Sequence, residues 1–196
     1  MTPGPAKSFD PEDALESARD LFWRRGYDGT AISELESALG IGRKSLYDTF
    51  GSKRGLFLGA LAKYVDTVIG RICGRLESVD GTAFQNLEQA LLKLGEYHGS
   101  GASDGCLLGV AMAQTSRDDE ELSEILRGYL DRLETAFERA IRRGLGEGDV
   151  GQGVRPKDAA RHLVALTQGM ALLGRVDAGR TTQRSIVRAA LESLRD

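Results

Sequence analysis

Apolar residues recur every three or four positions over most of the chain, which is the period of an amphipathic α-helix. No stretch alternates apolar and polar residues as a half-buried strand does. Glycines and helix-capping residues separate the periodic segments. The pattern predicts an all-α fold of nine helices, with three short helices first and six more packed around a larger core.

The three N-terminal helices have well-marked ends. Asp10 can cap the first helix, Pro11 fits its first position, and Gly26 ends it where a left-handed residue is needed. Thr30 is the expected cap of the second helix. After a turn containing glycine, the third helix is predicted from about Gly42 to Thr49.

Six further helices follow from apolar stripes in the rest of the chain. The fourth should begin at the cap Ser52 and run to about Leu76. Residues Cys106–Met112 are apolar on all sides, which predicts a buried central helix. The last two helices are expected at about Lys157–Arg175 and Thr181–Leu194.

Composition places the chain among soluble globular proteins. Of its 196 residues, 41% are hydrophobic and 28% are charged, and no apolar run approaches the roughly 20 residues that span a bilayer. Met1–Lys7 has no apolar segment that would direct export. Two cysteines, Cys73 and Cys106, are too few for a disulfide framework and suit a reducing compartment. We therefore expect a cytoplasmic protein with no membrane partner.

Residues 30–50 predict a helix, a glycine turn and a second helix, the arrangement that places its second helix in the DNA major groove. The segment 40–54 carries a net charge of +3, whereas the whole chain carries −3. A local cationic patch around a helix of this size favours binding to phosphates. On these residues alone, a small helical domain with a solvated charged face remains the alternative.

Residues 26–57, GYDGTAISELESALGIGRKSLYDTFGSKRGLF, resemble the DNA-binding region of the TetR family of bacterial transcription regulators. The matching positions are Gly26-Tyr27, Thr30, Ile32, Leu35, Gly40-Ile41, Ser45-Leu46-Tyr47, Phe50 and Ser52-Lys53. The resemblance implies a nine-helix homodimer that binds a double-stranded DNA operator. It divides the chain into a DNA-binding domain, residues 1–51, and a ligand-binding and dimerisation domain, residues 52–196. The implied function is a repressor released from a palindromic operator by a mainly apolar small molecule.

The resemblance also assigns residues to DNA. The predicted contacts are Thr30, Gly42, Arg43, Lys44, Ser45, Tyr47, Asp48, Thr49 and Lys53. Arg43 is the best candidate for reading guanine, because its guanidinium group can donate hydrogen bonds to two acceptors on the base. Thr30 and Lys53 would bind phosphates. Asp48 departs from the family pattern. Its negative charge weakens the attraction of this helix to DNA phosphates, unless the carboxylate accepts from a cytosine amino group or pairs with Arg43 or Lys44. Gly42 can cap a helix but supplies no side-chain oxygen.

The C-terminal part is expected to hold the effector. The predicted pocket lining is Tyr64, Val68, Leu91, His98, Cys106, Leu108, Met112, Tyr129, Phe137 and Met170. Gln114, His162 and Gln168 are further polar candidates in this region. For each lining residue the plain alternative is ordinary core packing. Cys106, expected in the first turn of its helix, is either a reactive thiol sensor or a small buried hydrophobe.

The last two helices are the expected dimer face. Its predicted apolar seam consists of Leu163, Leu166, Met170, Ile186, Ala190 and Leu194. Two such helices from each subunit would form a four-helix bundle across a two-fold axis. The same stripes could instead pack within one subunit.

No catalytic, metal or cofactor site is predicted. Residues 146–151 match the dinucleotide pattern G-x-G-x-x-G, but no strand precedes them. Cys73, His98, Cys106 and His162 are too scattered for a structural zinc site. A helical enzyme or small-molecule carrier, and a DNA-binding activator or architectural protein, are the alternatives. A carrier would show no preference for duplex DNA, whereas the affinity of a regulator for its operator falls with salt.

Overall fold

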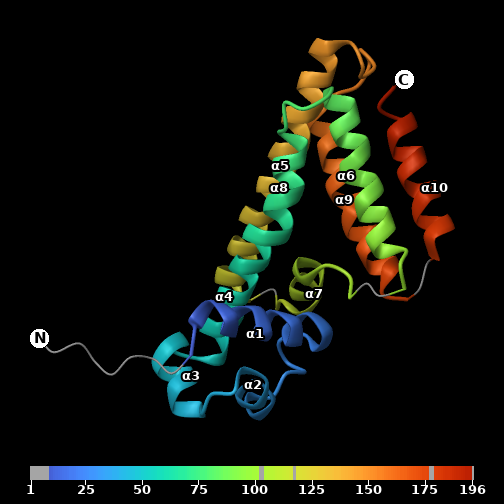
Figure 1. The fold of residues 1–196 in the computed structure, drawn as a ribbon. Helices are drawn as coiled ribbons and strands as arrows, with labels where there is room; N and C mark the ends of the chain where they lie inside the picture. Colours follow the sequence, from blue (N-terminus) through green and yellow to red (C-terminus); the bar gives the residue numbers. More distant parts are fainter. Residues whose placement is uncertain (1–8, 102–103, 117, 177–178, 196) are drawn as a thin grey trace, which may run out of the picture. The chain divides into compact units, whose positions relative to one another are not determined.

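The computed structural model describes residues 9–101, 104–116, 118–176 and 179–195; the segment Met1–Lys7 lies outside them. All regular structure in these ranges is helical, which confirms the predicted all-α class (Figure 1). The elements are α1 (Pro11–Arg25), α2 (Ile32–Leu39), α3 (Arg43–Phe50), α4 (Lys53–Tyr64), the π-helical segment η1 (Val65–Ile69), α5 (Gly70–Leu76), α6 (Ala83–His98), α7 (Leu107–Gln114), α8 (Glu120–Glu147), α9 (Pro156–Gly174) and α10 (Gly179–Glu192). Because α4, η1 and α5 are continuous, the described ranges contain the nine helices predicted.

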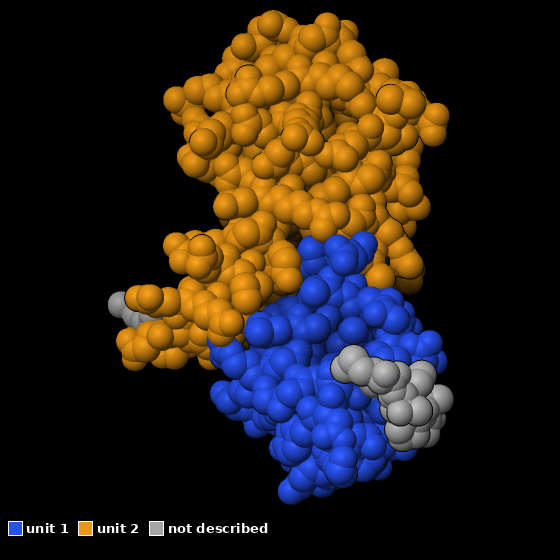
Figure 2. Space-filling model, turned by 90° about the vertical axis from the view of Figure 1, so that its left-hand side faces the viewer, with its two compact units in different colours: residues 1–66 blue, residues 67–196 orange. Residues whose placement is uncertain are grey.

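The chain divides into two compact units, residues 1–66 and 67–196 (Figure 2). This division reflects which residues pack together. The boundary expected after residue 51 separates DNA binding from ligand binding and dimerisation, and it stays a prediction. The continuous helix from Lys53 to Leu76 supplies residues to both units.

Helices α1 to α4 form the first unit around a small core. Phe22, Leu35, Leu46 and Leu56 are completely buried, and the ring of Phe22 meets Phe57 edge-on at 5.1 Å between centroids. As predicted, Asp10 caps α1, with its Oδ1 accepting a 2.8 Å hydrogen bond from the Glu12 amide. Gly26 ends α1 at a φ of +74°, a conformation that L side chains rarely adopt.

The predicted capping role of Thr30 is wrong. The N-cap of α2 is Ala31, and Thr30 is fully buried with its hydroxyl donating to the Gly26 carbonyl oxygen at 2.7 Å. The carboxylate of Glu34 instead accepts from the Ala31 amide at 2.9 Å. The end of α1 leaves carbonyl groups without a partner in the helix, and the start of α2 leaves amides without one. The Thr30 hydroxyl pairs with one of these carbonyls and not with an amide of α2.

The second unit is built on α5, α6, α8, α9 and α10. Its core includes Leu87, Leu91, Leu133 and Phe137, all at most 1% exposed. The N-terminus of α6 meets the end of α8, where Glu147 Oε2 accepts from the Ala83 amide at 2.6 Å. A carboxylate at a helix N-terminus is favourable because it satisfies free amides and complements the helix dipole.

The sequence-based prediction for α7 is partly wrong. Of this helix, Leu107, Leu108 and Ala111 are buried, whereas Met112 is half-buried and Gln114 is exposed. Within the second unit α7 packs on α8 and α9, and its buried residues Leu107, Leu108 and Ala111 lie on one side of the helix. An all-apolar sequence cannot distinguish a central helix from one that is packed on one side.

Candidate nucleic-acid interface and ligand pocket

The turn between α2 and α3 fixes the direction of α3. Gly40 adopts the left-handed conformation, with φ of +65°, and its amide donates to the Glu36 carbonyl. Ile41 and Leu46 are buried and attach α3 to the core. The opposite face of α3 is therefore directed to solvent.

That face carries the residues predicted to contact DNA. Arg43, Lys44, Tyr47 and Asp48 are exposed, as is the N-cap Gly42, which supplies no side-chain cap. Ser45 and Thr49 are half-buried at its edges. Thr30 does not join them, since its buried hydroxyl is already bonded to Gly26, so a phosphate contact from this hydroxyl is ruled out in this conformation.

Asp48 is paired on the helix surface. Lys44 Nζ lies 2.6 Å from Asp48 Oδ2, an i,i+4 pair that raises the pKa of Lys44, chiefly through the hydrogen bond. The Lys44 side chain is 88% exposed. A pair with Lys44 is among the roles that the sequence predicts for Asp48. Water screens a pair as exposed as this one, so a phosphate can replace the carboxylate at little cost.

Arg43 also has an acidic neighbour. Its Nη2 lies 3.4 Å from Glu36 Oε2, while the arginine side chain stays 60% exposed. Arg43 is the first residue of α3, and its guanidinium can leave this long contact for a base edge or phosphate.

Lys53 lies at the start of α4, where an anion would be favoured. Ser52 caps this helix, its Oγ accepting from the Gly55 amide at 3.0 Å as predicted. Lys53 Nζ lies 4.3 Å above the ring centroid of Tyr27, a cation–π contact that restrains the ammonium. A Cβ added at Gly55 would overlap the carbonyl oxygen of Phe50, so glycine is required where α3 turns into α4.

Most of the predicted pocket residues belong to packed cores. Leu91, Leu108, Phe137 and Met170 are at most 1% exposed. Tyr64 belongs to the first unit, where its ring meets Trp23 edge-on at 4.9 Å. Val68 in η1 and Tyr129 in α8 are half-buried, so the structure does not bring the predicted set into one pocket.

The polar pocket candidates His98 and Cys106 are also buried. Burial lowers the pKa of His98 from 6.5 to about 4, so its imidazole is neutral at pH 7. Cys106 is the N-cap residue of α7 and not, as expected, part of its first turn. Burial raises the pKa of the other thiol, Cys73.

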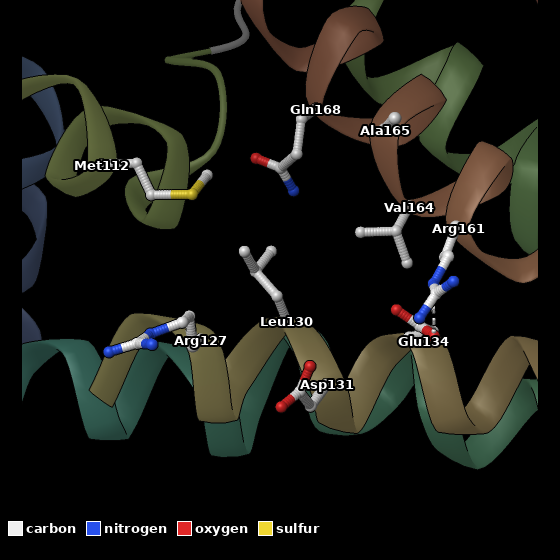
Figure 3. A pocket seen from close by; sticks show the side chains of 9 residues that line it. All are labelled: Met112, Arg127, Leu130, Asp131, Glu134, Arg161, Val164, Ala165 and Gln168. Carbon is white, nitrogen blue, oxygen red and sulfur yellow. Dashed lines mark hydrogen bonds and ion pairs between the residues drawn. The ribbon is translucent and has the colours of Figure 1, made fainter. Parts of the chain in front are cut away.

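A cleft of about 360 Å³ lies between α7, α8 and α9 in the second unit (Figure 3). It is lined by Met112, Arg127, Leu130, Asp131, Glu134, Arg161, Val164, Ala165 and Gln168. Met112 is the one predicted lining residue among them, and Gln168 was a polar candidate. The α8 residues were missed because their charges make this side of the helix resemble a solvated face.

The predicted dimer seam needs correction. Leu163, Met170, Ala190 and Leu194 are at most 2% exposed, so they pack within their own subunit, which was the stated alternative. Leu166 and Ile186 are half-buried. Several apolar side chains face solvent, among them Val79, Leu92 and Tyr97. Three of them lie together at or just after the end of α9: Leu172, 69% exposed, Leu173 and Val176.

A glycine turn between two short helices, with a cationic exposed second helix, defines a helix-turn-helix nucleic-acid-binding unit. Residues 14–60 match the family described as bacterial regulatory proteins, tetR family, and residues 102–196 match the C-terminal domain of BetI-type transcriptional repressors. The chain belongs to the TetR family of bacterial transcriptional regulators, and it is a DNA-binding regulator and not an enzyme.

Individual relatives agree with this assignment. The HTH-type transcriptional regulator YezE of Bacillus subtilis is 28% identical over 177 residues, 89% of this chain and 91% of YezE. The HTH-type transcriptional repressor BdcR of Escherichia coli is 45% identical over 65 residues, one third of each chain. A cysteine mutant of the TetR family regulator CifR, solved with a 26-bp operator DNA, superposes with a TM-score of 0.85 at 26% identity, covering 96% of this chain and 99% of that one.

The described residues contain neither a candidate membrane span nor a candidate metal cluster. No helix in the described ranges is both long and apolar enough to cross a membrane. Among the same residues, no three His, Cys, Asp or Glu side chains are grouped so that they could hold a metal ion.

Proposed function

We propose that this protein is a dimeric repressor that binds a palindromic operator and releases it when a small molecule binds the second unit. The observation that carries the proposal is the exposed cationic face of α3, presented by the turn at Gly40. The relatives BdcR and CifR support it, since one is named a repressor and the other was solved on operator DNA.

In this proposal α3 enters the major groove. Arg43 reads a guanine, and Lys44, Ser45, Tyr47 and Thr49 contact phosphates or bases along the groove. Lys53 binds a backbone phosphate next to the N-terminus of α4, where free amides favour an anion. Asp48 is displaced from Lys44 or accepts from a cytosine amino group.

A dimer gives the operator its symmetry. Two copies related by a two-fold axis place two copies of α3 on half-sites about one helical turn apart. We propose that the exposed face near the end of α9, with Leu172 and Leu173, contacts the partner, aided by the half-buried Leu166. Apolar side chains this exposed are typical of an interface.

The effector acts by preferring one conformation. A ligand in the second unit weakens operator binding only if it binds more tightly to a conformation in which the two α3 helices are wrongly spaced. The continuous helix Lys53–Leu76 supports such coupling, because it starts at the DNA-binding face and continues into the second unit.

The test is selection of bound duplexes from a random DNA pool with the full chain, followed by titration of the selected duplex at increasing salt. We expect an inverted repeat and a steep fall of affinity with salt. No enrichment at low salt would favour a carrier, and an operator bound without any effect on transcription would favour an architectural role.

Two variants separate base reading from phosphate binding. Arg43→Ala should relax sequence preference at one position per half-site and cost about 1–3 kcal/mol of binding free energy. Lys53→Ala should weaken all duplexes alike and flatten the salt dependence. Arg139→Ala, an exposed arginine of the second unit, is the matched control and should change neither.

A further inference from the structure

The cleft between α7, α8 and α9 has the size and composition of a small-molecule site. Its volume of about 360 Å³ lies within the range of roughly 300–1,000 Å³ typical of such sites. Met112, Leu130 and Val164 supply apolar surface from three different helices (Figure 3). An apolar body of moderate size would contact all three.

The charged residues around the cleft do not favour a charged ligand. Arg161 Nε lies 3.1 Å from Glu134 Oε1, so these two charges neutralise each other. Arg127 Nε donates to the Ser123 carbonyl at 3.1 Å, and Figure 3 shows its guanidinium directed away from Gln168. Arg127 and Asp131 are exposed to solvent. An ion entering the apolar part would lose its hydration without gaining a partner there.

Gln168 is the polar group placed among the apolar residues. Its Oε1 is shielded from solvent and accepts no hydrogen bond from the described part of the chain. The oxygen lies against α7, where a Cβ added at Gly109 would be 3.2 Å from it. Figure 3 shows the amide oxygen on the side of Met112 and the amide nitrogen on the side of Leu130 and Val164. A buried acceptor without a donor is costly, so a ligand that supplies the donor is favoured.

We infer that this cleft is the effector site and that its ligand is an uncharged amphipathic molecule with an apolar body and a hydroxyl group. The hydroxyl is the group that fits best, because it accepts from the Gln168 amide nitrogen and donates to Oε1 once the amide turns about its last bond. This inference rests on the proposed ligand-responsive function and names the chemical class of the ligand.

The test measures direct binding to the free protein, with no DNA present. Three probes share one alkyl chain: 1-octanol, octanoate and n-octylammonium. Calorimetric titration should give one 1-octanol per chain, with the two ions binding at least about tenfold more weakly. Gln168→Leu should weaken 1-octanol binding about five- to tenfold, the size expected for one neutral hydrogen bond.

Two further variants control for folding and position. Gln114→Leu makes the same change at an exposed glutamine of α7 that does not line the cleft, and it should leave binding unchanged. Val164→Phe fills the cleft and should abolish binding while circular dichroism stays that of the parent. Retained binding in Val164→Phe would overturn the assignment of the site.

Other results would also overturn the inference. These are tighter binding of either ion, equal 1-octanol affinity in Gln168→Leu and the parent, and no saturable binding. A 1-octanol affinity that falls as protein concentration rises would mean that a second copy covers the cleft. Operator selection in the absence of ligand decides the proposed DNA-binding function separately, so the two failures are distinguishable.

Discussion

Acidification from pH 7 to pH 5 should destabilise this protein through one residue, His98. The imidazole lies at the end of α6, is 4% exposed, and packs beside the Tyr97 ring at 5.0 Å between centroids. The backbone of α9 comes so close that a Cβ added at Gly174 would lie 2.7 Å from the His98 carbonyl oxygen. Burial therefore lowers the pKa of His98 from 6.5 to about 4.

The sign and size of the effect follow from proton linkage. Well above pH 6.5 neither the folded nor the unfolded chain protonates His98, and its contribution to stability is fully present. Between pH 6.5 and 4 the unfolded chain binds a proton that the folded chain refuses, so stability falls as pH falls. At about 1.4 kcal/mol per pH unit, the free energy of unfolding drops by about 2 kcal/mol between pH 7 and pH 5.

Urea unfolding followed by far-ultraviolet circular dichroism at constant protein concentration measures this drop. Fluorescence of Trp23, the single tryptophan, is less suitable because Trp23 belongs to the first unit and His98 to the second. The chain has two histidines, and His162 is exposed, so His162→Gln is the matched control and should retain the drop. His98→Gln should lose most of it. An undiminished drop in His98→Gln would refute the reasoning.

Three further predictions concern the DNA-binding face, the backbone and the dimer. Asp48→Asn removes the partner of Lys44, so operator affinity in gel-shift titrations should rise and its salt dependence should steepen. Gly55→Ala should lower the free energy of unfolding by about 1–3 kcal/mol, because its Cβ meets backbone. A Cβ added at Gly128 in α8 meets no atom within 4 Å, so Gly128→Ala should raise the free energy of unfolding by about 1 kcal/mol. Thermal unfolding measures both glycine variants. Leu172→Asp should shift sedimentation from dimer to monomer.

The variants at Asp48 and Leu172 each have a matched control. Asp158→Asn makes the same charge change on α9 and should leave the operator affinity and its salt dependence unchanged. An Asp48→Asn variant with weaker binding would instead indicate that this carboxylate reads a base. Val79→Asp places an aspartate at an exposed valine outside α9 and α10, and dimers should persist. If Leu172→Asp also stays dimeric, the contact lies elsewhere.

The DNA-binding face could be predicted from sequence because its determinants are local. Gly40 and the buried Leu46 lie within a few residues of Arg43 and Lys44, so helix period alone places these cations opposite the core. The error at Thr30 has a local cause too. A hydroxyl between two helices can bond forward to an amide or back to a carbonyl, and only the geometry of the connection decides.

The ligand pocket could not be predicted in the same way. Leu91, Phe137 and Met170 are apolar at helical spacing, which describes core residues and pocket residues equally well. The cleft instead exposes Arg127 and Asp131 beside Leu130, on a side of α8 that resembles an ordinary solvated surface. Its existence depends on how α7 packs against α8 and α9.

The sequence by itself therefore determined which segments form helices, and that one short helix presents cations to solvent. Capping groups, glycines and the 3.6-residue period act over a few residues, and the chain carries all of them. The tertiary structure decided which apolar faces meet within the subunit, leaving Leu172 exposed and Leu163 buried on the same helix. It also decided where a cleft remains, because burial depends on contacts between segments far apart in the chain.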